Sequence, residues 1–341
     1  TPEMLRAGNS DIVQFVQNPK LDKNKYYDVK QIMSYIANDK NIIINNKNEI
    51  YNFPTKKLSF PINMQAAQAI GLVAAGDTTS LPAINLDLQK NALYKYDLLT
   101  LDIVANNINE RPIYFAVSVS PSSFIGFQNY FEQEGLTYRI VPRRNLTGQP
   151  TQSPVNTDVM FDNMMNDFKW GQIDTNPKVY VDENISRMTL NLVSNFVRLS
   201  GDLMRKGELE RGVEVLDKCL KVLPIAKVPY NFFHSEIPGL YITGGQEEKA
   251  KEVATQILAS AIQELDYFVL VYNNKIERLK KTNPSALTQY QAGLFSQNRA
   301  VMEQLYLLQQ VANTYQKTDD KEFADKITAV LADYSAKLKK I

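Results

Sequence analysis

Few side chains in this chain could carry out chemistry. Its 341 residues include one histidine, His234, and one cysteine, Cys219. A single cysteine excludes an internal disulfide framework and a cysteine-rich metal site, and a single histidine excludes motifs built on a histidine pair. The surrounding patterns favour a packed, hydrogen-bonded helix residue for His234 and a buried structural thiol for Cys219. The sequence therefore predicts no metal site, no cofactor and no catalytic residue.

The acidic residues give no stronger signal. Asp97 and Asp102 could form an acid/base pair, but both fall on a predicted helix without a histidine partner, which favours capping and a solvated face. Glu110-Arg111 could form a site at a strand entrance, although an internal ion pair is favoured. Glycine-rich phosphate loops and the G-x-S-x-G, H-E-x-x-H and D-x-D patterns are absent.

Charge and hydropathy exclude two further classes of partner. Lys+Arg 38 against Asp+Glu 37 gives a formal charge of +1, which lacks the basic field of a nucleic-acid-binding protein. Residues 58–76 and 112–131 are uncharged or nearly so, but they contain too many polar groups for a membrane span. The 18 tyrosines and 15 phenylalanines are spaced like core residues rather than like sugar-stacking platforms.

The pattern of apolar and turn residues predicts a mixed α+β fold. An α/β module is expected over residues 1–184, followed by an all-α helical domain over 185–341. In the module, helices are expected at 28–37 with Asp28 as N-cap, at about 96–107, and at 127–134 ended by Gly135. Residues 113–117 are expected to form a fully buried strand. The composition of residues 143–156 indicates a long loop, followed by a short helix near 161–168. Further strands are expected at 42–44, 49–53, 58–62, 84–88 and 136–141.

The helical domain shows a pattern typical of tetratricopeptide repeats. When Pro224 is aligned with the last proline of a unit of about 34 residues, small residues occupy the positions where two helices must approach closely. A weaker second unit turns at 244–245, and three more helices are expected at 259–281, 285–315 and 319–339. The small positions hold Ser200, Gly212 and Cys219, and the large apolar positions hold Phe196, Leu199, Leu203 and Leu216.

The concave side of such a helix array is the binding surface that this alignment predicts. It would suit a protein partner, and a glycan is a further candidate. The residues displayed there would be Ser194, Val197, Gly201, Met204 and Arg205, with Phe232 and Ser235 from the next unit.

Several motifs in one order carry a family resemblance. They are residues 26–30 (YYDVK), 53–57 (FPTKK), 101–107 (LDIVANN), 110–116 (ERPIYFA), 130–131 (YF) and 134–142 (EGLTYRIVP). Together they resemble the C-terminal region of a multi-pass membrane-protein family of unknown function that is similar to protein O-mannosyltransferases and common in Bacteroidota. The motif residues singled out are Asn106, Asn107, Glu110, Arg111, Pro112 and Tyr114.

The resemblance implies that membrane helices and a catalytic carboxylate lie outside this chain, and that the chain faces the periplasm at the bacterial inner membrane. The leading hypothesis is a non-catalytic C-terminal domain that binds or positions a protein acceptor. One alternative is a stand-alone extracytoplasmic glycan-binding lipoprotein on a tetratricopeptide scaffold. Another is a hydrolase that uses acids near Glu110 or Glu134. Asp77-Thr78-Thr79 fits a bacterial O-glycosylation pattern, which makes Thr78 a candidate acceptor.

Overall fold

The computed structural model describes residues 12–45, 48–145, 153–286 and 298–340, and it divides the chain into two compact units, Thr1–Met160 and Phe161–Ile341. The sequence placed this boundary near residue 184. Residues after 160 belong with the helices because Trp170 stacks on Phe196, with ring centroids 5.4 Å apart. In addition, the Lys227 side chain donates a hydrogen bond to the Pro177 carbonyl at 2.7 Å. The mixed α+β class is confirmed.

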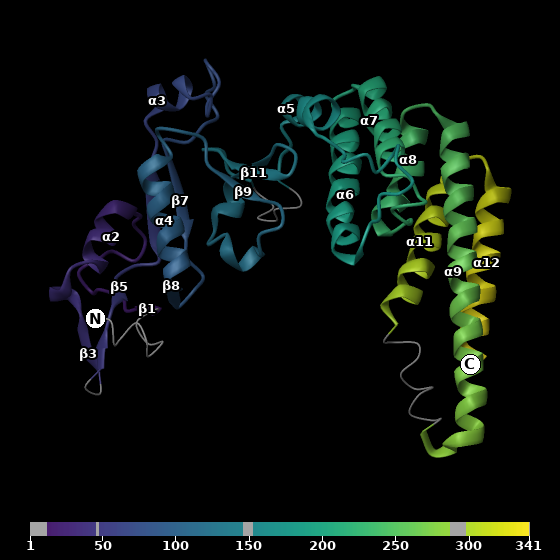
Figure 1. Cartoon of the computed structure of the whole chain (residues 1–341). Coiled ribbons are helices and arrows are strands. Elements are labelled where there is room, and N and C mark those ends of the chain that lie inside the picture. Colours follow the sequence, from purple (N-terminus) through teal and green to yellow (C-terminus); the bar gives the residue numbers. More distant parts are fainter. Residues whose placement is uncertain (1–11, 46–47, 146–152, 287–297, 341) are drawn as a thin grey trace. The chain divides into compact units, whose positions relative to one another are not determined.

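Small sheets make up the first unit (Figure 1). Within its described part, β5-β1-β8, β2-β6-β7 and β10-β11-β9 form three-stranded sheets and β3-β4 a hairpin. The pairs β1–β5 and β2–β6 are parallel, and the others are antiparallel. The strands are β1 (Ile12–Phe15), β2 (Tyr27–Asp28), β3 (Ile43–Asn45), β4 (Asn48–Ile50), β5 (Asn52–Phe53), β6 (Lys57–Pro61), β7 (Ala83–Asp87), β8 (Ala92–Tyr94), β9 (Tyr114–Ala116), β10 (Phe131–Gln133) and β11 (Thr137–Ile140).

Alternation along the strands builds the core of this unit. Leu58 and Phe60 on β6 are buried and lie opposite buried residues of β7. Phe131 on β10 stacks on Tyr138 of β11 at 5.1 Å and meets Phe124 edge to face at the same distance. The helices around the sheets are α2 (Val29–Ile36), α3 (Met64–Ala69) and α4 (Lys95–Asn107), with single turns η2 (Asp39–Asn41), η3 (Pro121–Ser123) and η4 (Phe127–Tyr130); α5 (Thr157–Asp162) crosses the boundary.

Local sequence signals predicted one helix cap of this unit correctly and two other elements wrongly. Asp28 caps α2 as predicted, because its Oδ1 accepts a hydrogen bond from the Lys30 amide at 2.7 Å. The prediction of a fully buried strand at 113–117 was wrong, since β9 is an edge strand with Tyr114 and Ala116 exposed. The helix expected at 127–134 was also wrong beyond Tyr130. Pairing with β11 makes β10 extended, and Gly135, at φ +96°, lies in the turn that follows.

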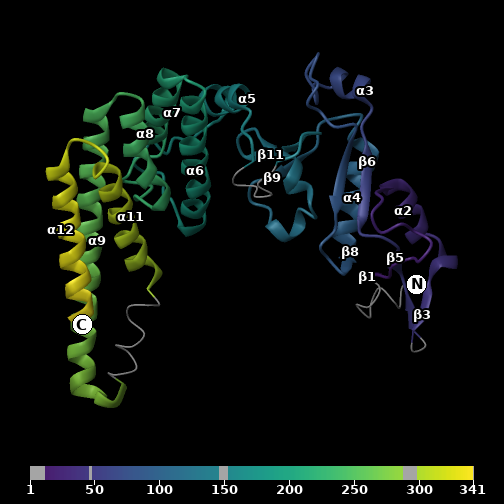
Figure 2. The same cartoon turned by 180° about the vertical axis from the view of Figure 1, so that it is seen from behind.

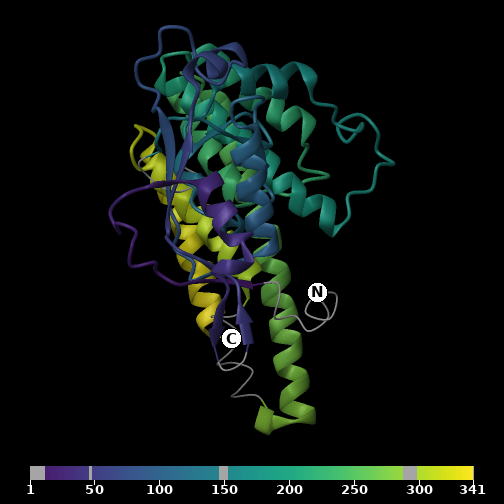
Figure 3. The ribbon, with the colours of Figure 1, turned by 90° about the vertical axis from the view of Figure 1, so that its left-hand side faces the viewer.

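Long helices form the second unit: α6 (Glu183–Arg205), α7 (Leu209–Val222), α8 (Ile237–Thr243), α9 (Glu247–Thr282), α11 (Arg299–Tyr315) and α12 (Lys321–Lys340). Shorter pieces are η6 (Asn163–Asp167), η7 (Phe232–Glu236) and η8 (Pro284–Ala286). The views in Figures 1 and 2 both place α9, α11 and α12 side by side. Figure 3 shows the last turns of α9 extending beyond the end of α12.

The contact between α6 and α7 depends on small residues. A Cβ on Gly212 would lie 2.6 Å from Met204 Cγ, and the Ser200 hydroxyl donates to the Gly212 carbonyl at 2.8 Å. This is the close approach that the small positions predicted.

The repeat pattern does not continue in the expected form. The helix expected to begin at residue 259 is wrong, because α9 is continuous over 36 residues without glycine or proline, and buried residues continue along it as far as Ile276. Residues 287–297 of the helix expected at 285–315 lie outside the described residues. The tetratricopeptide-like array therefore stays a prediction.

Candidate functional site

Part of the predicted groove on α6 is covered by helix α8. A Cβ on Gly201 would lie 3.7 Å from Leu240 of α8, and a Cβ on Gly244 would lie 3.2 Å from Met204 Cε. Val197, Met204 and Ser235 are buried, at 5%, 7% and 3% exposure. This corrects the predicted groove, because these three side chains are packed inside the unit and offer no open surface. Ser194 and Gly201 are half-buried, and Arg205 is exposed and pairs with Asp202 on its own helix.

Phe232 lies in an exposed aromatic surface instead. Its ring stacks on Tyr306 of α11 with centroids 5.0 Å apart, and Met302 lies one helical turn before Tyr306. Phe232, Tyr306 and Met302 are 41%, 42% and 47% exposed. We call these three residues the Phe232 patch. An exposed cluster of two aromatic rings and a methionine resembles the anchor residues of protein interfaces.

The motif at the end of α4 is held by local bonds. The Arg111 guanidinium donates to Asn107 Oδ1 at 2.8 Å, so the expected ion pair with Glu110 is replaced by a bond to the helix end. Asn106 donates to Asp102 Oδ1 at 3.0 Å. Glu110 is exposed and Pro112 is half-buried. These bonds close the end of α4.

Tyr114 contributes to a partly buried polar group, the Glu134 cluster, made of Tyr114, Glu134, Arg139 and Asn156. The Glu134 carboxylate accepts hydrogen bonds from Tyr114 Oη at 3.1 Å, Arg139 Nη1 at 3.3 Å and Asn156 Nδ2 at 3.2 Å. Arg139 also donates to the Gly71 carbonyl at 2.8 Å. Burial, together with the Glu134 charge, raises the pKa of the Tyr114 hydroxyl. The arrangement fixes Glu134 in place.

A second polar group joins residues of two early motifs. Tyr26 Oη donates to Asp87 Oδ2 at 2.8 Å, and Lys57 Nζ reaches Asp87 Oδ1 at 2.8 Å. Burial opposes ionisation, but these bonds hold the pKa of the Asp87 carboxyl below its ordinary value. The sequence analysis missed Asp87. Its partners Lys57 and Tyr26 lie 30 and 61 positions before it in the chain, so no local spacing links them.

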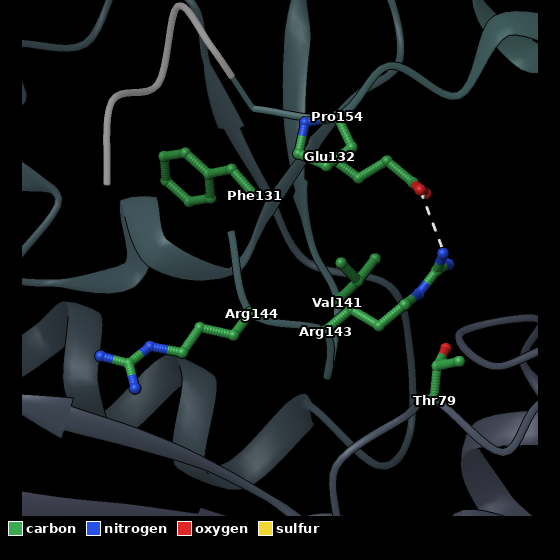
Figure 4. Close-up of a pocket in the computed structure, with 7 residues that line it drawn as sticks. All are labelled: Thr79, Phe131, Glu132, Val141, Arg143, Arg144 and Pro154. Atoms are coloured by element: carbon green, nitrogen blue, oxygen red, sulfur yellow. Dashed lines mark ion pairs between the residues drawn. The ribbon is translucent and has the colours of Figure 1, made fainter. Parts of the chain in front are cut away.

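The first unit contains a pocket of about 260 Å³. Figure 4 shows the Arg143 side chain reaching toward the Glu132 carboxylate while the Arg144 guanidinium points away from this pair. Arg143 Nη2 lies 3.6 Å from Glu132 Oε1, and its Nε lies 3.9 Å from Asp77 Oδ2. Burial raises the pKa of the Glu132 carboxyl despite the nearby Arg143 charge. We call this site the Arg143 pocket, lined by Thr79, Phe131, Glu132, Val141, Arg143, Arg144 and Pro154.

Asp77 is rigidly placed beside that pocket. It accepts hydrogen bonds from the Thr79 hydroxyl at 2.6 Å, the Thr79 amide at 2.7 Å and the Ser80 hydroxyl at 2.8 Å. These bonds lower the pKa of the Asp77 carboxyl to about 2. Thr78, the candidate glycosylation residue, is exposed in the same loop. These bonds tie Asp77 to Thr79 and Ser80, and modification of Thr78 stays a prediction.

The remaining candidates are structural. Asp97 is fully buried, caps the start of α4 through the Tyr94 amide at 3.0 Å and pairs with Lys90 at 2.7 Å, as the capping prediction required. His234 accepts a hydrogen bond from the Asn231 amide, and burial lowers its pKa to about 4. Burial raises the pKa of the Cys219 thiol. Among the residues that the structure describes, no group of His, Cys, Asp and Glu side chains could hold a metal ion.

Comparison with known proteins bears on the first unit. No helix within the described ranges is long and apolar enough to cross a membrane. No curated protein and no solved structure matches the chain. The motifs that carry the family resemblance, however, lie within a matched family model. Residues 1–159 match TMEM260-associated domain 2, so the first unit is similar to a domain of unknown function linked to TMEM260, a glycosyltransferase-like membrane protein.

Proposed function

We propose that this chain is a non-catalytic region of a glycosyltransferase-like membrane protein of the O-mannosyltransferase type, and that it binds or positions a protein acceptor on the extracytoplasmic, periplasmic side. The observation that carries the proposal is the match of residues 1–159 to a TMEM260-associated domain. The membrane connection would come from sequence outside this chain, as the family resemblance implies.

The polar geometry supports a binding role over a catalytic one. Glu134 has three hydrogen-bond donors around its carboxylate, and a carboxylate that is fully engaged lacks the freedom of a general base. Tyr26 and Lys57 likewise occupy both oxygens of Asp87. These groups order loops and strand ends, which is a structural role.

The Phe232 patch supports protein binding by the second unit. Its rings are already stacked at 5.0 Å, so an incoming partner would find ordered aromatic anchors at a small entropic cost. A flexible acceptor segment with apolar side chains is the chemistry that this surface suits.

Two measurements test the proposal with the 341-residue chain. A sugar-transfer assay with lipid-linked mannose and an acceptor protein should show no product, and detected transfer would defeat the non-catalytic role. Acceptor binding measured by surface plasmon resonance should weaken about tenfold in Phe232→Ala, as expected for an interface anchor. The matched control is Tyr267→Ala, an aromatic residue of α9 that is 59% exposed and outside the patch. Equal binding by both variants would exclude the Phe232 patch.

A further inference from the structure

We infer that the Arg143 pocket binds a neutral, polyhydroxylated ligand the size of one sugar residue, with Arg143 and Glu132 sharing its hydroxyl groups. This site lies wholly in the first unit and does not depend on the proposed acceptor binding by the second.

The first argument is the spacing around Arg143. Its contacts of 3.6 Å to Glu132 and 3.9 Å to Asp77 are ion-pair distances, too long for the usual N–H···O hydrogen bond of about 2.7–3.2 Å. The guanidinium donors and the facing carboxylate oxygens are therefore incompletely satisfied by each other. An oxygen atom placed beside such a pair can hydrogen-bond to both of its members.

A hydroxyl group suits this position because it accepts from a guanidinium and donates to a carboxylate at the same time. Two neighbouring hydroxyls on a sugar ring would do so twice, from Arg143 to Glu132 and from Arg143 to Asp77. Both acceptors are held in place: the Glu132 side chain is only 12% exposed, and Asp77 is fixed by three hydrogen bonds. Such preorganisation lowers the cost of binding.

Charge argues against an anion. Two carboxylates, Glu132 and Asp77, face the single Arg143 guanidinium. Figure 4 shows the Arg144 side chain directed away from Glu132 and Arg143. Phosphate would therefore meet repulsion from both acids at the position where it met Arg143. A cation would be repelled by the Arg143 guanidinium, which already pairs with the same two carboxylates.

Size and lining select a small ligand. The pocket volume of about 260 Å³ lies below the range of roughly 300–1,000 Å³ found for drug-sized ligands, which suits one ring rather than an oligosaccharide. The apolar wall comes from the buried Phe131 and Val141, with Pro154 beside them. A sugar has an apolar C–H face as well as a polar rim, and both kinds of wall are present.

The experiment is ligand-observed saturation-transfer NMR with the 341-residue chain and the methyl glycosides of glucose, galactose, mannose and N-acetylglucosamine, with inorganic phosphate as the anion. At least one sugar should bind with a Kd of about 1 mM, which is ordinary for a few shared hydrogen bonds. Arg143→Gln and Glu132→Gln should each weaken it about tenfold. Arg111→Gln, an exposed arginine bonded to its own helix end, should leave it unchanged.

A second readout needs no variant. The sugar that binds should slow phenylglyoxal modification of Arg143, measured by mass spectrometry, while Arg111 stays equally reactive. No signal from any sugar would overturn the inference, and so would Arg143-dependent binding of phosphate without sugar. Sugar binding that neither substitution weakens, with no protection of Arg143, would place the ligand elsewhere and overturn it as well.

Discussion

Buried polar groups differ between the two units. Among the described residues, the charged side chains that are buried, Asp97 and Glu134, both lie in the first unit. The second unit buries neutral groups such as Ser200 and His234, and its long-range ion pairs, including Lys249–Asp217, lie at the surface. Buried charge needs exact partners, whereas neutral small groups need only close packing. The difference indicates that the first unit depends on matched ionic partners, whereas the second depends on close packing.

The largest expected effect would break the charge network of the first unit. Glu134→Ala removes the carboxylate that Tyr114, Arg139 and Asn156 share, and it leaves Arg139, whose side chain is 12% exposed, without its ion-pair partner. Removal of one partner of a buried pair costs about 3–5 kcal/mol. Hydrogen exchange in peptides covering β10 and β11 should rise accordingly.

The single tryptophan provides the control for that comparison. Trp170 lies in the second unit against Phe196, so its fluorescence follows unfolding of that unit. Glu134→Ala should leave the fluorescence transition unchanged. A shift of that transition as large as the change in hydrogen exchange would mean that the two units unfold together, and the comparison would fail.

Acid should weaken the second unit through its only histidine. The buried His234 has a pKa of about 4 in the folded chain, against about 6.5 when unfolded, so the unfolded state binds the proton first. The contribution of neutral His234 to the free energy of unfolding is fully present above pH 6.5 and is lost as the pH falls toward 4. The loss reaches about 3 kcal/mol at the lower end. The Trp170 transition should show this loss.

His234→Gln tests the cause of that pH dependence. Because the chain has one histidine, the variant removes the only imidazole, and the slope of stability between pH 6.5 and 4 should flatten. An unchanged slope in the variant would assign it to carboxyl groups instead.

Close packing of α6 against α7 gives the next effect. Gly212→Val would place a Cβ 2.6 Å from Met204 Cγ and 3.2 Å from the Ser200 carbonyl oxygen, where only the flexible methionine can move. Overpacking of this kind costs about 2 kcal/mol. The Trp170 transition should shift while exchange in β10 and β11 stays as in the parent.

Gly207→Ala is a useful contrast on the same helix pair. Gly207 has open space around it but a φ of +87°, so this substitution introduces backbone strain without a clash. An equal loss of stability in Gly212→Val and Gly207→Ala would mean that the turn, and not the small-residue contact, determines the stability of the helix pair.

The same contrast explains what the sequence could predict. The Asp28 cap, the Asp97 cap and the small contact at Gly212 depend on residues a few positions apart or on a regular helix period, so local spacing revealed them. The Arg143 pocket joins Thr79, Glu132 and Arg143, whose meeting depends on strand pairing that no local spacing encodes. The apolar run at 113–117 was misleading because an edge strand and a buried strand share the same composition.

The smallest effect tests a cap that the sequence did reveal. Asp28→Ala removes the acceptor of the Lys30 amide at the start of α2, and loss of such a cap costs about 1 kcal/mol. Hydrogen exchange should rise in peptides covering α2, with no change in the Trp170 transition. Lys30→Ala is the matched control, because the donated hydrogen bond comes from the backbone and survives the substitution. If Lys30→Ala destabilised α2 as much as Asp28→Ala, the effect would belong to the surface of the helix and the cap would contribute nothing to the first unit.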